Sequence, residues 1–136
     1  KSSKKHETIP ISKSEIFKEN EVLTKISNLS VNVLKPHGSI SFGSVEHILE
    51  TYSSSNVHQI LIIDMINVGM VDLTGIFALE DLINSLRKSN IEVYVTRPSS
   101  KIEYLLDKTG FLKNIGRDNF SNDLHSIVTS ILSQKA

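Results

Sequence analysis

The chain has 136 residues, enough for one domain with a single core, and its apolar content of 39% is ordinary for a soluble globular protein. Fifteen basic and fifteen acidic residues cancel, which argues against the basic surface expected of a nucleic-acid-binding protein. The absence of cysteine excludes disulfides and thiolate metal sites. No purely apolar run exceeds the four residues of Ile60–Ile63, so no segment of this sequence is predicted to span a membrane.

Residues 1–30 are predicted to form a polar lead-in to the folded domain. Its first part, Lys1–Ser14, carries four lysines against one glutamate, a net charge of +3. Such a composition is typical of a solvated, irregular tail, and also of a linker held near anionic lipids. A short helix is possible within Glu15–Leu29. The chain starts at Lys1 rather than Met, which indicates a fragment of a longer protein.

The regular domain is expected to begin at Val31 with a strand over Val31–Leu34. Ile40 and Phe42 then alternate with serines, which predicts a second, half-buried strand. Apolar residues at helical spacing follow up to Tyr52. Ser44 is the predicted N-cap of that helix.

The most apolar part of the chain predicts the centre of the sheet. A strand is expected over Val57–Ile63, and the continuous apolar run at its end indicates that both of its faces are covered. A strong helix is predicted from Ile76 to Lys88, because its apolar residues recur with helical period. Ile91–Val95 then alternates apolar and polar residues as another strand.

The last third of the chain is expected to contain a helix that Ser99 or Ser100 caps and Gly110 ends. A residual strand is predicted at Ile115–Gly116, followed by a final helix over Phe120–Leu132. Strands that alternate with helices predict an α/β fold, with a mixed sheet of four to five strands packed against about four helices.

No motif for catalysis or metal binding is recognisable. None of the five histidines has a zinc-binding spacing, and there is no glycine-rich phosphate-binding loop. Asp64 and Asp72 could approach one another around one loop and act as an acid–base pair. A strand end and a helix cap explain the two aspartates more simply. The chain is therefore expected not to be an enzyme and to need no metal or cofactor.

The segment "VDLTG", Val71–Gly75, has the residues of a well-capped helix start. Asp72 or Thr74 can accept hydrogen bonds from the free N–H groups of the first turn. Asp72 also places negative charge at the positive end of the helix dipole. Gly75 allows the backbone to approach its neighbours closely. Open α/β folds tend to bind ligands at such strand ends, so Asp72, Leu73, Thr74 and Gly75 form the candidate regulatory or interaction loop.

The segment "ILIIDMINVGMVDLTGIFALEDLINSLRKSNIEVYVT" resembles the core of a STAS domain, a family shared by sulfate transporters and anti-sigma-factor antagonists. Its hallmark is a strand that ends in Asp, then a short loop, then Asp-Ser/Thr-Ser/Thr-Gly at a helix start. The corresponding residues here are Asp64 and Asp72–Gly75. The resemblance covers about Val31–Leu132, and the expected order of elements agrees with the fold of that family.

Two features separate the branches of the family. In the antagonist branch, the residue after the aspartate is a phosphorylated serine or threonine, whereas this chain has Leu73, which has no hydroxyl. The segment "GSISFGSVEHI", Gly38–Ile48, is similar to the corresponding part of SulP-type transporters. Phe77–Ile83 is also more similar to that branch.

The resemblance implies that residues 31–136 are the cytoplasmic C-terminal STAS domain of a bacterial SulP-type anion transporter, at the inner membrane. Its expected role is regulation, assembly or anchoring. The implied partners are the transmembrane domain of the same chain, a second copy or a cytosolic regulatory protein. One alternative is a free-standing antagonist-like module in a partner-switching cascade. Another is a nucleotide- or anion-sensing module with weak binding, although Val68–Ala78 contains no basic residue.

Overall fold

The computed structural model of the chain describes residues 6–10, 26, 29–53 and 59–135. Most of the helix considered within Glu15–Leu29 lies outside these residues. So does the beginning, at Val57 and His58, of the strand predicted over Val57–Ile63.

Within the described part of the chain, the main sheet has five strands in the order β1-β2-β4-β6-β7. β1 pairs with β2 in the antiparallel sense, and the other neighbours are parallel. The sheet is therefore mixed, and its central strand β4 contains the apolar run, as predicted. The strands are β1 (His6–Pro10), β2 (Val31–Pro36), β4 (Ile60–Asp64), β6 (Glu92–Thr96) and β7 (Phe120–Ser121).

β1 lies inside the predicted polar lead-in, whose composition does not indicate a strand. It pairs with β2 along its whole length, from His6 opposite Pro36 to Pro10 opposite Asn32. Proline at the end of an edge strand is tolerated because that position needs no ladder N–H. Part of the lead-in is thus built into the sheet.

A second, small sheet joins β3 (Gly38–Ile40) to β5 (Val68–Val71) in parallel. β5 was not predicted, because only its first and last residues are buried and it shows no alternation. The predicted strand through Phe42 is wrong at that residue. Phe42 instead opens the following helix, and its side chain is 57% exposed.

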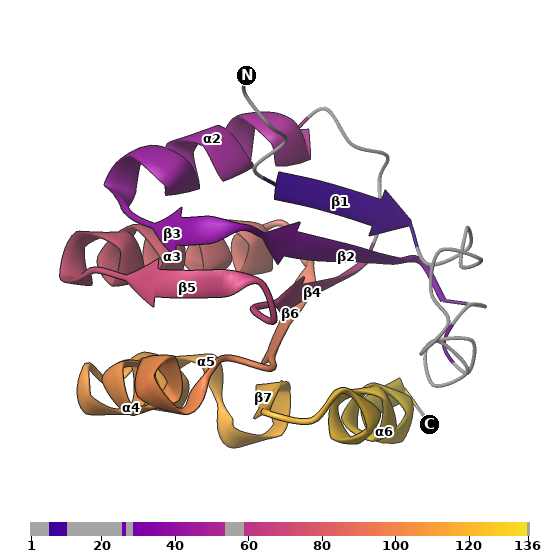
Figure 1. Cartoon of the computed structure of the whole chain (residues 1–136). Coiled ribbons are helices and arrows are strands. Elements are labelled where there is room, and N and C mark those ends of the chain that lie inside the picture. Colours follow the sequence, from indigo (N-terminus) through magenta and orange to yellow (C-terminus); the bar gives the residue numbers. More distant parts are fainter. Residues whose placement is uncertain (1–5, 11–25, 27–28, 54–58, 136) are drawn as a thin grey trace.

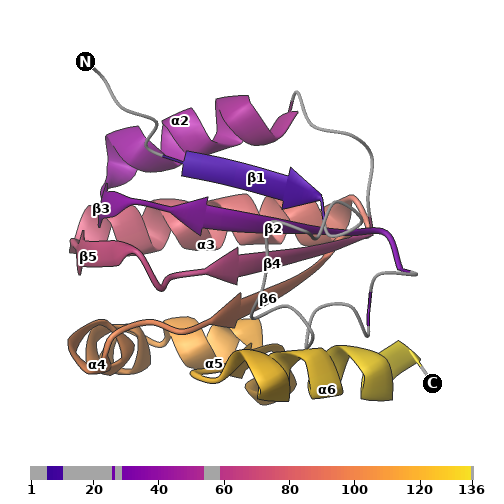
Figure 2. The same cartoon turned by 45° about the vertical axis from the view of Figure 1, so that its right-hand side comes forward.

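Helices cover both faces of the main sheet. α2 (Phe42–Ser53), α3 (Leu73–Lys88), α4 (Ser100–Lys108) and α5 (Phe111–Ile115) lie on one side of it, and α6 (Leu124–Lys135) on the other (Figures 1 and 2). The predicted α/β class is confirmed. The short helix α5 was not predicted, because Gly110, with φ of 84°, both ends α4 and precedes α5.

Other boundaries also differ from the sequence prediction. Ser41, not Ser44, precedes the first residue of α2; its N–H donates to the hydroxyl oxygen of Ser44 at 2.7 Å, a reciprocal arrangement of the capping-box kind. Ile115 belongs to α5, and the short strand is β7, which pairs with Val95 and Thr96 of β6. α6 begins at Leu124 rather than Phe120, because the Asp123 carboxylate accepts from the N–H of Ser126.

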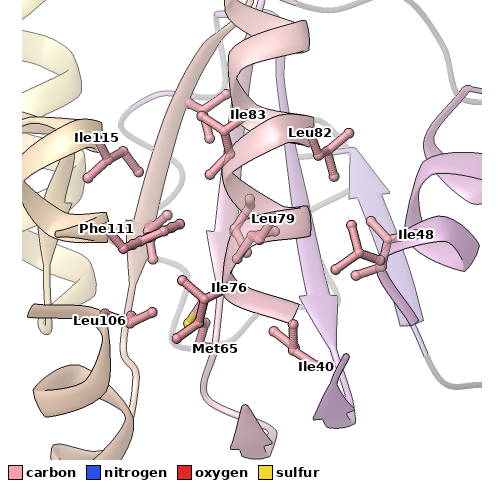
Figure 3. Packing of buried hydrophobic residues seen from close by; sticks show 14 of the residues in the cluster. Ile40, Ile48, Met65, Ile76, Leu79, Leu82, Ile83, Leu106, Phe111 and Ile115 are labelled. Carbon is pink, nitrogen blue, oxygen red and sulfur yellow. The ribbon is translucent and has the colours of Figure 1, made fainter. Parts of the chain in front are cut away.

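The core has two parts, one on each face of β4. Leu61 and Ile63 face a cluster built around α3, and Ile60 and Ile62 face a cluster built around α6. Figure 3 shows α3 within the first cluster, with Ile48 of α2 on one side and Phe111 of α5 on the other. Each fully buried side chain of this size contributes about 1.5–3 kcal/mol, which explains why the continuous apolar run takes the central position.

Candidate functional site

The candidate loop Asp72–Gly75 is a capped helix start. Asp72 is extended and precedes α3; its Oδ1 accepts from the N–H of Gly75 and from the hydroxyl of Thr74, each at 2.7 Å. These two donors hold the pKa of the Asp72 carboxyl below its usual value, the Thr74 hydroxyl first and the Gly75 N–H second. Asp72 is the cap, and Thr74 supports the cap rather than serving as one.

Gly75 fixes the first turn of α3 against the end of β3. A Cβ at this position would lie 2.7 Å from the carbonyl carbon of Ile40 and 2.9 Å from the Cα of Ser41, which is closer than packed atoms approach. The N–H of Asp72 donates to the Ile40 carbonyl oxygen at 3.1 Å. The loop is therefore attached to β3 at both of its ends, and position 75 has no room for a side chain.

Exposed apolar side chains lie beside the polar cap of the loop. Leu73 is 53% exposed, and Phe77, one turn further along α3, is about equally exposed. Residues four apart lie on the same face of a helix, so the two side chains are neighbours. Met70 at the end of β5 and Phe42 at the start of α2 are also exposed. Exposed apolar side chains gathered near one loop are typical of a protein-contact surface.

Asp64 has a different role from the loop. It is 1% exposed, and its carboxylate accepts two hydrogen bonds from Arg97: Nε at 3.2 Å and Nη2 at 2.7 Å. The N–H of Ile66 donates to the same carboxylate at 3.1 Å. A buried carboxylate needs such partners to offset its loss of hydration. Asp64 thus holds together the ends of β4 and β6 and the turn that leads into β5.

Arg97 is a site residue that sequence reasoning missed. It adopts φ of 58°, a left-handed conformation that costs energy for a residue with a side chain. In the sequence, Arg97 stands directly before Pro98, a position that indicates a strand end and gives no sign of an ion pair. Its ion pair with Asp64 connects residues far apart in the chain, and local patterns carry no information on such pairs.

Asp64 and Asp72 have separate hydrogen-bond partners. Each accepts hydrogen bonds from its own set of donors, and those two sets share no residue. Within the described ranges, no group of three or more metal-ligating side chains could hold a metal ion. Of the helices described, none is both long and apolar enough to cross a bilayer.

The fold is that of known transporter domains. The STAS domain of a SulP transporter from Vibrio cholerae superposes with a TM-score of 0.64 at 23% identity, over 86% of this chain and 96% of that domain. The murine anion transporter Slc26a9 superposes with a TM-score of 0.66 at 19% identity, over 79% of this chain and 18% of the transporter. At these identities, the likeness concerns the fold.

The sequence also matches a transporter directly. Sulfate transporter 1.2 of Arabidopsis thaliana is 39% identical over 61 residues, which are 45% of this chain and 9% of that protein's length. The family model of the STAS domain matches residues 23–127, the greater part of the chain. The expected resemblance is confirmed, and the chain belongs to the STAS domain family.

Proposed function

We propose that this chain is the cytoplasmic C-terminal STAS domain of a bacterial SulP-type anion transporter, at the cytoplasmic side of the inner membrane. Its role is to regulate, assemble or anchor the membrane domain, and it catalyses no reaction itself. The observation that carries the proposal is the 39% identity to a sulfate transporter within a chain of the STAS family. The matched region is a small part of that transporter, so transport belongs to the parent protein.

The loop supports this branch over the antagonist branch. Leu73 occupies the position of the phosphorylated hydroxyl, and its side chain is exposed and apolar. The neighbouring hydroxyl of Thr74 donates to Asp72 and stabilises the cap. A phosphate on Thr74 would bring about two negative charges beside the Asp72 carboxylate, which is unfavourable. An exposed leucine is better suited to a permanent apolar contact than to a phosphorylation switch.

The arrangement also argues against a nucleotide or anion sensor at the start of α3. An anion there would use the free N–H groups of the first turn. The N–H of Gly75 already donates to Asp72, whose negative charge would repel a phosphate. The segment Val68–Ala78 supplies no basic side chain to offset that repulsion.

The parent gene and a deletion test the proposal. The reading frame upstream of Lys1 should encode a series of apolar segments of about 20 residues each. Deletion of Val31–Ala136 from the parent protein should reduce the uptake of radiolabelled sulfate or the amount of transporter in the membrane. A reading frame that starts shortly before Lys1 without such segments would show that the proposal is wrong.

A further inference from the structure

A groove lies between α2 and α3 and shares Phe42 with the apolar side chains near the loop. The two helices run side by side (Figures 1 and 2). The groove has a volume of about 210 Å³ and is open to solvent. α2 contributes one wall and α3 the other. The groove, called here the α2–α3 groove, is lined by Phe42, Val45, Glu46, Leu49, Ala78, Asp81, Leu82 and Ser85.

The α2 wall carries two exposed apolar side chains at helical spacing. Phe42 and Leu49 are two turns apart on the same face of α2 and are 57% and 47% exposed. On the α3 wall, Ala78 and Ser85 are small, which leaves the hollow between the helices. Exposed apolar side chains on one wall, opposite Ala78, Ser85 and the buried Leu82 on the other, form a groove suited to an amphipathic helix.

The charged side chains that line the groove are both acidic. Its two charged side chains are Glu46 on α2 and Asp81 on α3, and both are exposed. Neither lysine nor arginine is among its described lining residues. An apolar segment with acidic flanks would be repelled here, whereas Lys or Arg beside the apolar anchors would be attracted from both walls.

We propose that the α2–α3 groove binds an amphipathic segment with basic flanks, contributed by the cytoplasmic loops of the membrane domain. This inference rests on the proposed function. The cytoplasmic loops of membrane proteins carry an excess of Lys and Arg, which matches the acidic flanks of the groove. The partner's apolar residues fill the space between Phe42, Leu49 and Ala78, and its basic residues pair with Glu46 and Asp81.

The charge preference is measured first with model peptides and the 136-residue chain. One short helical peptide carries leucines at helical spacing and lysines elsewhere; the other replaces every lysine by glutamate. Fluorescence anisotropy should show that the lysine peptide binds about tenfold more tightly or better. Glu46→Lys combined with Asp81→Lys should reverse the preference. The control, Asp107→Lys with Asp118→Lys, makes the same change of charge on α4 and on the short 3-10 helix Arg117–Asn119, and it should leave the preference in place.

The apolar contact is tested with matched leucines. Leu49→Ala should weaken the lysine peptide about tenfold, whereas Leu132→Ala on α6, where the leucine is 39% exposed, should have no effect. Circular dichroism of each variant shows that it is folded. Equal binding of the two peptides, or equal effects of the two alanine variants, would overturn the proposal. Self-association of the chain that Leu49→Ala abolishes would assign the groove to a second copy instead.

The source of the segment is tested separately, with synthetic peptides of each cytoplasmic loop of the parent protein. At least one basic loop peptide should displace the lysine peptide from the wild-type chain and fail to bind the Leu49→Ala variant. If the parent has transmembrane segments but no loop competes, the inferred partner is wrong while the proposed function stands. If the parent has no transmembrane segments, the proposed function and the inferred partner are both wrong. The model peptides then decide by themselves whether the groove binds a basic segment.

Discussion

Gly75 at the start of α3 packs directly on the carbonyl group of Ile40 at the end of β3. A Cβ on residue 75 would be 2.7 Å from the Ile40 carbonyl carbon. The obstructing atoms belong to the backbone of Ile40 and Ser41, which cannot rotate away as a side chain can. The glycine of the family hallmark is therefore explained in this chain by packing between two backbone segments.

The Gly75→Ala variant should be less stable by about 1–3 kcal/mol, because α3 must shift away from β3 to make room for the methyl group. Urea denaturation followed by circular dichroism measures this loss. Gly43→Ala in α2 is the control: nothing lies within 4 Å of its Cβ position, and alanine is the better helix former. If both variants have wild-type stability, the close approach to Ile40 is not a constraint.

Asp72→Asn should lower the thermal unfolding temperature at neutral pH, because a neutral amide replaces the charged acceptor of Thr74 and Gly75 and loses its favourable interaction with the helix dipole. The pKa of Asp72 is lowered in the folded chain, so its contribution is complete above the unfolded pKa of about 3.9 and is lost as the pH falls through the folded value. The difference between wild type and Asp72→Asn should therefore be constant near pH 7 and shrink below about pH 4. A difference that is the same at pH 7 and at the lowest accessible pH would contradict the charged cap.

Arg97→Ala should destabilise the domain by about 3–5 kcal/mol, because it leaves the buried carboxylate of Asp64 without its cationic partner. Asp64→Asn in the same background should recover part of the loss, and a double-mutant cycle measured by urea denaturation gives the coupling. Arg117→Ala removes an exposed arginine that follows α5 in the chain, and it should change stability by less than about 0.5 kcal/mol. If the losses of unfolding free energy from the Asp64 and Arg97 substitutions simply add, the ion pair between them does not contribute to stability.

A serine kinase of the antagonist type should leave the wild-type loop unmodified, since position 73 is leucine. Leu73→Ser is the comparison, because it places a hydroxyl beside Asp72 while the cap and Gly75 are unchanged. Intact-mass spectrometry after incubation with the kinase gives the result. Stoichiometric phosphate on Thr74 of the wild type would revive the partner-switching alternative.

The elements that the sequence predicts well are those whose residues are buried in an unbroken run or at a regular helical period. β4 follows from a run of apolar residues that only a strand covered on both faces can bury, and α3 follows from its apolar period and its cap. β5, α5 and β7 were missed or misplaced because they are short and their burial follows no clear period. Phe42 was placed in a strand because alternation with serines cannot be told from the first residues of a helix.

The site divides in the same way. The cap of Asp72 on Gly75 is local, within one turn, and was predictable. The contact of Gly75 with Ile40 was anticipated only as a close approach, because the neighbour lies far away in the chain. The ion pair of Asp64 with Arg97 and the groove between α2 and α3 depend on tertiary packing, and neither has a local pattern that would reveal it.

The attachment of the loop to β3 has a consequence for recognition. The backbone of residues 72–75 is held in one conformation. The constraints are the hydrogen bond from Asp72 to Ile40, the cap on Gly75 and the tight packing of Gly75. A partner that docks on Leu73 therefore meets a preorganised surface, and association loses little conformational entropy on this side of the interface. The affinity of such a contact is set by which side chains project from the loop, and a single substitution at position 73 can retarget the surface without remodelling it.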